Sequence, residues 1–201
     1  MHILIVLAHP RPASLNAAVC DALCNGLRET GHTIDLADLN AEGFDPVLRG
    51  PELDQLGAGP PGKDVAAYQQ RMLQADALAF IFPVWWFGLP AILKGFIDRV
   101  FQEGFAFRFT SRGRVRGLLA HKSALVICTA GASSSLYRLF RFSRPLEKTF
   151  VEWTLKTCGI RTVRQVIFHD VKNVSAAARA RYLKQARRLG REYFGNEISA
   201  V

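Results

Sequence analysis

Three continuous apolar runs constrain the fold of this chain more than any other feature. They are residues 3–8 (Ile-Leu-Ile-Val-Leu-Ala), 77–82 (Ala-Leu-Ala-Phe-Ile-Phe) and 124–129 (Ala-Leu-Val-Ile-Cys-Thr). A run without polar alternation is typical of a strand buried on both faces, as in the centre of a parallel sheet. Two further strands are expected at 33–36 and 163–168, and the alternating character of the second indicates a sheet edge.

Segments with helical periodicity separate these strands. Helices are expected at about 15–27, 64–74, 91–100, 145–157 and 175–194, with irregular connections at 40–62 and 102–121. Strands that alternate with helices predict an open parallel sheet covered on both faces. Five strands in 201 residues favour an α/β, flavodoxin-like doubly wound sheet of order 2-1-3-4-5, in a single domain spanning 1–201.

Composition excludes several classes of protein. With 49% hydrophobic and 21% charged residues, the chain is not of the disordered class. The longest apolar run, 77–93, is broken by prolines and a glycine and is too short for a membrane span, and no secretory leader pattern is expected. The four cysteines lack the spacing of a zinc site, so we expect no metal, reduced thiols and a cytoplasmic location.

The net charge of +9 is concentrated in one part of the chain. Residues 138–201 hold 14 Lys and Arg against 5 Asp and Glu, whereas the remainder is balanced. Such a basic region can attract nucleic acid, a membrane surface or an anionic cofactor. Its basic residues are not interleaved with aromatics in a known nucleic-acid module, so no nucleic-acid partner is expected.

Ligands of such sheets bind at the carboxyl ends of the strands, which directs attention to three loops. In the first, residues 9–16, Ser14 is placed as a helix N-cap, and free amides at a helix N-terminus bind phosphate. His9 and Arg11 can add charge, and Asn16 a side-chain donor. The loop lacks the Gly-Lys-Ser/Thr of nucleoside triphosphatases, and by itself it also fits an ordinary capped turn.

The second loop is Phe82-Pro-Val-Trp-Trp-Phe-Gly-Leu-Pro90, in which three aromatics follow a strand end between two prolines. A flat apolar wall of this kind would suit a flavin ring. The third loop, 128–135, is rich in small residues, which allow a ligand to approach the backbone closely.

Residues 82–100 closely resemble the signature of the NAD(P)H:quinone oxidoreductase family. That family includes DT-diaphorase, the modulator-of-drug-activity reductases and ancillary proteins of potassium efflux systems. The resemblance extends through 103–109 and through His9 with Ser14-Leu15-Asn16, and so covers most of the chain. It implies a flavodoxin-like fold, a tightly bound flavin and a homodimer.

Site residues follow from the resemblance by position. His9, Ser14, Leu15 and Asn16 match the family's flavin-phosphate site. The residues that match the lining of the flavin ring system are Pro83, Val84, Trp85, Trp86, Phe87, Thr129, Ala130 and Gly131.

The substrate side is less closely matched. Trp86, Phe107 and Phe109 match the substrate pocket, and the two phenylalanines replace tyrosines that cover the substrate from the partner subunit. Phe105, Phe107 and Phe109 alternate and are expected to expose an aromatic stripe. Tyr137 matches a catalytic tyrosine. The family's subsequent histidine is missing from 138–150, where three arginines (138, 141 and 144) offer positive charge.

The activity implied is a two-electron, ping-pong transfer of hydride from NAD(P)H to a quinone through the flavin. FAD is expected, with FMN as the alternative, and no residue decides between them or between NADH and NADPH. Two other functions stay open. One is reduction of azo or nitro compounds on the same fold, and the other is a flavin-binding regulatory subunit with a potassium transporter as partner.

Overall fold

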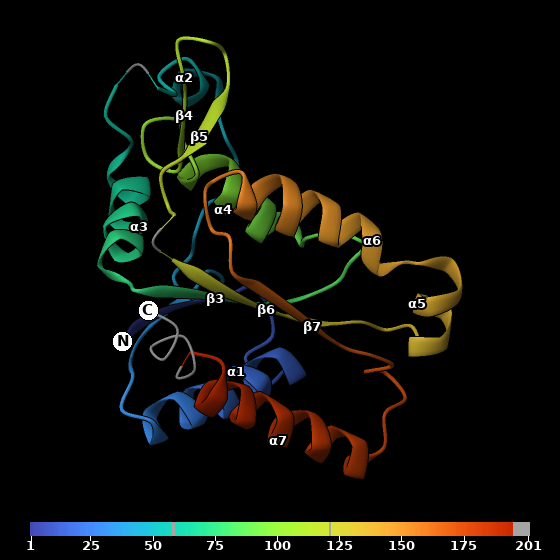
Figure 1. Ribbon diagram of the computed structural model, residues 1–201. Coiled ribbons are helices and arrows are strands. Elements are labelled where there is room, and N and C mark those ends of the chain that lie inside the picture. The colour runs from blue at the N-terminus through green and yellow to red at the C-terminus, as the bar shows by residue number, and fades with distance from the viewer. Residues whose placement is uncertain (58, 121, 195–201) are drawn as a thin grey trace.

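The computed structural model describes residues 1–57, 59–120 and 122–194, and it is built on a five-stranded parallel sheet (Figure 1). The strands are β1 (His2–Leu7), β2 (Thr33–Asp38), β3 (Ala77–Pro83), β6 (Ser123–Thr129) and β7 (Val163–Phe168). Their order is β2-β1-β3-β6-β7, which is 2-1-3-4-5 when only these strands are counted. The predicted flavodoxin-like fold is therefore confirmed.

The three apolar runs form the three central strands. Every residue of β3 and β6 is buried, and β1 is buried from Ile3 onward, because helices cover both faces of the sheet. The edge strands β2 and β7 are only partly buried, as their mixed sequences indicate. The carboxyl ends of β1, β3 and β6 thus lie side by side in the middle of the sheet.

Each face of the sheet has its own helical layer. Helices α1 (Leu15–Glu29) and α7 (Ala176–Glu192) pack on one face, together with the odd-numbered side chains of β1 (Figure 1). Helices α3 (Lys63–Gln74), α4 (Ala91–Val100) and the π-helix η1 (Glu147–Lys156) cover the other face. The four cysteines are buried in these layers and unpaired.

The contact between α1 and α7 depends on glycine. Gly26 of α1 faces the backbone carbonyl of Arg187, and a Cβ at Gly26 would collide with it. Gly190 of α7 faces the backbone of α1 at Leu23 and Leu27 in the same way. This close approach joins the carboxyl-terminal halves of α1 and α7, and the amino ends of both helices contribute to the cavity described below.

Two expected connections contain further elements, and one expected helix is present but divided. The segment 40–62 contains a short helix, α2 (Gly50–Leu53), and 102–121 contains a hairpin of β4 (Phe107–Phe109) and β5 (Val115–Gly117). The expected helix 145–157 is divided into α6 (Ser143–Leu146) and η1, and it is preceded by α5 (Ser134–Phe140). Helix α5 is capped by Ser133, whose hydroxyl accepts a hydrogen bond from the Leu136 N–H at 3.4 Å.

Candidate functional site

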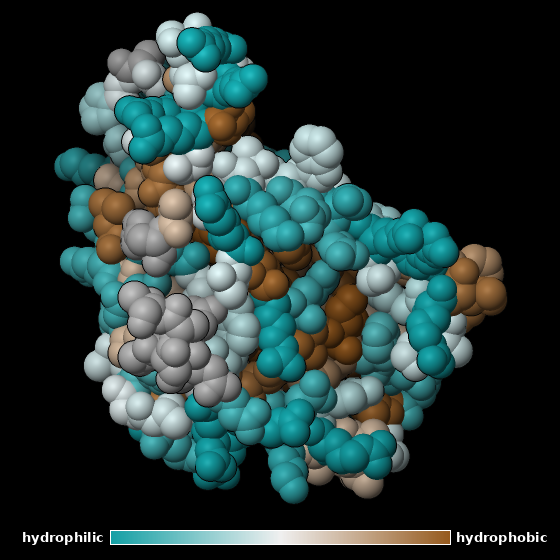
Figure 2. Space-filling model, viewed as in Figure 1, coloured by the Kyte–Doolittle hydropathy of each residue, from teal (hydrophilic) through white to brown (hydrophobic). Residues whose placement is uncertain are grey.

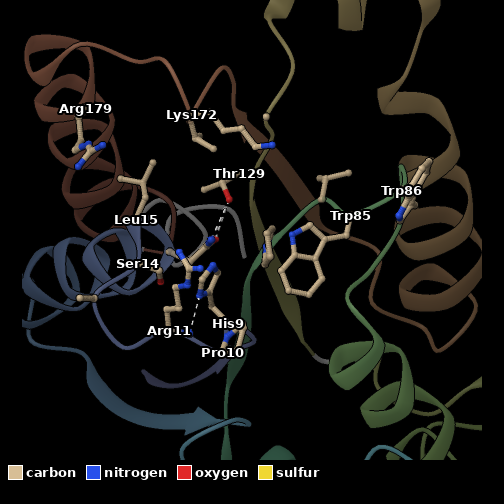
Figure 3. A pocket seen from close by; sticks show the side chains of 16 residues that line it. His9, Pro10, Arg11, Ser14, Leu15, Trp85, Trp86, Thr129, Lys172 and Arg179 are labelled. Carbon is tan, nitrogen blue, oxygen red and sulfur yellow. Dashed lines mark hydrogen bonds between the residues drawn. The ribbon is translucent and has the colours of Figure 1, made fainter.

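A cavity of about 840 Å³ opens where β1, β3 and β6 end, and we call it the main cavity. It lies at the position where doubly wound sheets bind their ligands. Figure 3 shows side chains from several loops pointing into it. Its lining comprises residues 9–11, 13–16, 83–86, 129, 131, 171–172 and 179.

One end of the main cavity is the amino end of α1. The Ser14 hydroxyl accepts a hydrogen bond from the Ala17 N–H at 3.1 Å, and no acidic side chain lies in the first turn. His9 Nδ1 accepts a hydrogen bond from the Arg11 N–H at 3.0 Å, which orders the loop. Burial lowers the pKa of His9, so its ring is neutral at neutral pH. Free helical amides and the Arg11 side chain make this end suited to an anion.

A buried polar contact joins this end to the centre of the sheet. Asn16 Nδ2 donates to Thr129 Oγ1 at 2.9 Å, and both side chains are almost fully buried (Figure 3). Because each polar group satisfies the other, the first turn of α1 is fixed to the end of β6. The floor of the cavity is therefore held by a tertiary hydrogen bond as well as by the strands.

The opposite end of the main cavity is aromatic. After β3, the Val84 N–H donates to the Thr129 carbonyl at 2.8 Å, and Trp85 and Gly88 exchange two backbone hydrogen bonds. This tight turn places Trp86 (φ 49°) and Phe87 (φ 62°) in the left-handed region. Strain of this kind at bulky residues often accompanies function. The Trp86 side chain is 95% exposed at the cavity mouth, and Trp85 forms the wall beside it.

Two basic side chains complete the lining on the side of α7. Lys172 follows β7, and Arg179 lies in the first turn of α7, which Ser175 caps. Figure 3 shows Arg179 on the side opposite to Trp86. Sequence reasoning did not select these residues, although both belong to the basic C-terminal region.

Comparisons with known proteins show which family this chain belongs to. A family model described as the flavodoxin-like fold matches residues 1–189. The chain is 32% identical to an uncharacterized NAD(P)H oxidoreductase of Haemophilus influenzae over 92% of each chain. It is 30% identical to the guinea pig (Cavia porcellus) NAD(P)H dehydrogenase [quinone] 1 over 90% of this chain and 72% of that protein.

Among solved structures, an NAD(P)H:quinone oxidoreductase from Methanothermobacter marburgensis superposes with a TM-score of 0.86. Its sequence is 32% identical, and the match covers 96% of both chains. The chain belongs to the NAD(P)H:quinone oxidoreductase family. Its main cavity is therefore the region to compare with the residues that the family resemblance predicts.

Most of those residues lie in the main cavity. His9, Ser14, Leu15, Asn16, Pro83, Val84, Trp85, Trp86, Thr129 and Gly131 line it. Phe87 does not, because its ring packs against Phe142 with a centroid distance of 4.5 Å. Ala130 is buried in the wall, where its N–H donates to the Phe168 carbonyl at 2.8 Å.

Tyr137, which the resemblance matches to a catalytic tyrosine, lines a second cavity of about 590 Å³ between α5, α6 and the end of β7. Its ring packs against His169 with a centroid distance of 4.6 Å, and burial raises its pKa. The rim of this second cavity carries three arginines (138, 141 and 144), so we call it the arginine cavity.

The expected aromatic stripe on 105–109 is wrong for two of its three residues. Phe105 and Phe107 pack against the hydrophobic core, and only Phe109 is clearly exposed, at 55%. Phe107 lines a third cavity of about 510 Å³ together with Val115 and Trp153. Neither Phe107 nor Phe109 reaches the main cavity of its own chain.

The described residues show neither a metal-ligating cluster nor a helix that could span a membrane. No group of three or more His, Cys, Asp or Glu side chains there is arranged to hold a metal ion. Within the same residues, no helix combines the length and apolar character needed to cross a bilayer.

Proposed function

We propose that this protein is a flavin-dependent NAD(P)H:quinone oxidoreductase. The observation that carries the proposal is that the two ends of the main cavity differ in chemistry. The end at α1 is suited to an anion, and the end at Trp85 and Trp86 is aromatic. Relatives over most of this chain bear the names NAD(P)H oxidoreductase and NAD(P)H dehydrogenase [quinone]. The arrangement supports a ligand with a flat apolar ring at one end and phosphate at the other.

A flavin fits the chemistry of this lining. Ser14 and the first amides of α1 would hold a phosphate, and the turn at 83–86 would wall the ring system with Trp85 and backbone groups. When bound, the flavin supplies hydride transfer, which no side chain can perform. The protein then orients the ring, and the exposed Trp86 at the mouth offers an apolar face to an arriving nicotinamide or quinone.

FAD is the proposed flavin, and the basic pair Lys172 and Arg179 is the reason. The α1 end already provides for one phosphate, which is all that FMN has. Lys172 and Arg179 line the same cavity beyond that point, on the α7 side, where a second phosphate and an adenosine would lie (Figure 3). Release of the bound flavin followed by chromatography tests this choice. FMN as the released species would overturn it and leave the activity standing.

The decisive test of the activity uses the purified protein. We expect a flavin absorbance spectrum, or its appearance when flavin is added, and reduction of a quinone at the expense of NAD(P)H. Failure to bind FAD or FMN more tightly than about 10 μM, roughly 7 kcal/mol, would contradict the proposal. Activity should also be measured with azo and nitro compounds as acceptors. A higher kcat/KM for one of these than for quinones would support the reductase alternative.

Tyr137 is the proposed catalytic side chain. Its ring is buried beside His169, and it follows the loop at 129–131 that leads out of the main cavity. Tyr137 lines the arginine cavity and not the main cavity, so its proposed role in stabilising charge during hydride transfer rests on the family resemblance. Tyr137→Phe is expected to lower kcat without loss of fold, and an unchanged kcat would remove Tyr137 from the mechanism.

We also propose a homodimer in a reducing, cytoplasmic setting. Phe109 is 55% exposed and Trp153 is 72% exposed, and such apolar surface favours a second copy as cover. The four buried, unpaired cysteines are typical of a reducing compartment. Sedimentation should give twice 22.3 kDa at micromolar concentration. Copurification with a membrane transporter would instead support the regulatory-subunit alternative.

A further inference from the structure

The arginine cavity carries positive charge that no ion pair among the described residues neutralises. Arg138, Arg141 and Arg144 lie at its rim, and none of them makes an ion pair with another described residue. The lining includes one carboxylate, that of Glu147, which is also unpaired within those residues. Clustered guanidinium groups repel one another unless an anion lies between them. The cavity therefore has the charge of an anion site.

The floor of the same cavity contains an unsatisfied polar atom. His169 Nδ1 is buried, and among the described residues it has no hydrogen-bond partner. A buried polar atom without a partner costs about 1–3 kcal/mol, so it is normally satisfied by a ligand or water. A neutral imidazole nitrogen donates or accepts according to the tautomer. A hydroxyl does both, so it can supply the missing partner in either case.

The backbone at the rim is strained in a way that favours a role for Arg141. It ends α5 in the left-handed region, with φ 53° and ψ 36°, where glycine or asparagine is usual. The turn is held by the Phe142 N–H, which donates to the Tyr137 carbonyl at 3.1 Å, and by stacking of Phe140 on Phe142 at 5.2 Å. Strain kept at a bulky charged residue indicates that its position serves a purpose.

The arginine cavity and the main cavity are neighbours. The wall between them consists of the loops after β6 and β7, which are joined by two hydrogen bonds. The Asp170 N–H donates to the Ala132 carbonyl at 3.0 Å, and the Val171 N–H donates to the Ala130 carbonyl at 3.1 Å. Gly131 and Val171 line the main cavity, while Ser134 and His169 line the arginine cavity. A dinucleotide with one end in the main cavity can therefore place its other end across this wall.

We propose that the arginine cavity binds the 2′-phosphate of NADPH and makes the enzyme prefer NADPH to NADH. The arginines supply forked donors for a phosphate monoester, and the adjacent ribose 3′-hydroxyl supplies the hydrogen-bond partner that His169 Nδ1 lacks. This inference rests on the proposed function, because it assigns the adenosine end of the nicotinamide substrate. It differs from the FAD assignment, which places a phosphate in the main cavity near Arg179.

A binding experiment tests the phosphate site without turnover. Calorimetry on the flavin-loaded protein compares 2′,5′-ADP with 5′-ADP, which lacks the 2′-phosphate. We expect 2′,5′-ADP to bind about tenfold more tightly or better, and the double variant Arg138→Gln/Arg144→Gln to abolish the difference. The control Arg181→Gln/Lys184→Gln removes the same charge from the exposed face of α7. In this control the difference in affinity between the two nucleotides should persist. Equal binding of the two nucleotides by the parent protein would overturn the proposal.

Kinetics then connect the site to the substrate. The ratio of kcat/KM for NADPH to that for NADH should be about ten or more in the parent and close to one in the Arg138→Gln/Arg144→Gln variant, through a higher KM for NADPH alone. Equal use of both nucleotides by the parent would overturn the inference while the proposed function stands. Absence of activity with either nucleotide would count against the proposed function, and the binding comparison would still decide whether the phosphate site exists.

Discussion

The main cavity and the arginine cavity lie side by side at the carboxyl ends of the strands, but different elements form them. The main cavity uses the ends of the three central strands and the first turn of α1, held by the buried bond between Asn16 and Thr129. The arginine cavity uses the end of the edge strand β7 and the short helices α5 and α6, with exposed charges at its rim. Substitutions in a cavity that is lined by core elements cost stability, whereas substitutions of the exposed arginines at a rim do not.

The same contrast is visible at the surface. Helix α5 projects from the body of the molecule, and Figure 2 shows apolar surface at its tip, where Leu136, Leu139 and Phe140 are exposed. The loops of the main cavity lie instead against the central strands. We therefore expect cofactor retention and stability to depend on one region, and nucleotide preference to depend on the other.

The largest effect is expected where α1 meets α7. Gly26→Ala places a Cβ against the Arg187 carbonyl, and neither backbone can yield without separating the helices. We expect a loss of about 1–3 kcal/mol in the free energy of unfolding, measured with urea. Flavin retention should also fall, because Ser14 and Arg179 lie on these two helices. Affinity for 2′,5′-ADP should persist in the folded fraction.

Gly50→Ala serves as the matched control for that substitution. Gly50 lies in α2, and a Cβ there would have no neighbour within 4 Å. Its stability and flavin retention should equal those of the parent. A Gly26→Ala protein as stable as Gly50→Ala would show that the contact between α1 and α7 does not fix the main cavity.

The next effect concerns the buried bond at the floor of the main cavity. Thr129→Val removes the hydroxyl that accepts from Asn16, and it leaves a buried amide unpaired at a cost of about 1–3 kcal/mol. The double variant Asn16→Leu/Thr129→Val removes both polar groups and should recover much of that loss. Thr149→Val, at an exposed hydroxyl of η1, should change stability by less than about 0.5 kcal/mol. A double variant no more stable than Thr129→Val would contradict the interpretation.

Trp86→Ala tests the mouth of the main cavity. Because the indole is 95% exposed, its loss should change the free energy of unfolding by less than about 0.5 kcal/mol. Quinone reduction should nevertheless fall by about tenfold or more, roughly 1.4 kcal/mol of transition-state stabilisation, with the preference for NADPH unchanged. Leu73→Ala, at an exposed position on α3, is the control. A fully active Trp86→Ala protein, or one that unfolds by circular dichroism, would reject the role in the pocket.

The sequence predicts the main cavity better than the arginine cavity for a physical reason. The runs at 3–8, 77–82 and 124–129 are short and continuously apolar, as expected of central strands that are buried on both faces. Once these strands are assigned, the loops at their carboxyl ends are assigned too. Ser14 then follows as a local cap that needs no tertiary information.

The features that sequence reasoning did not find depend on tertiary contacts. Helix α5 has only seven residues, too few to show periodicity, and it ends at Arg141 in a conformation that no arginine predicts. The inward packing of Phe107 follows from the β4–β5 hairpin. His169 lies one residue beyond a predicted strand, and its proximity to Tyr137 requires β6 and β7 to be neighbours.

The smallest expected effect is a pH dependence that the two cavities share. Burial lowers the pKa of His9 in the main cavity and of His169 in the arginine cavity, and it does the same for His32 beside the amino terminus. The unfolded chain gains protons on these rings near its ordinary pKa of 6.5, while the folded chain stays neutral. Stability from these groups is therefore complete above that value, and it is lost as pH falls toward the folded pKa values.

Urea unfolding at about pH 7.5 and about pH 5.5 measures this loss, since the interval spans the ordinary pKa of histidine. Both His9→Asn and His169→Asn should reduce the difference between the two pH values. Saturating 2′,5′-ADP should reduce it further only where His169 is present, because a bound phosphate favours the protonated ring in that cavity. An effect of 2′,5′-ADP that depends on His9 instead would place the nucleotide phosphate in the main cavity. It would thereby remove the distinction between the two cavities on which the preference for NADPH rests.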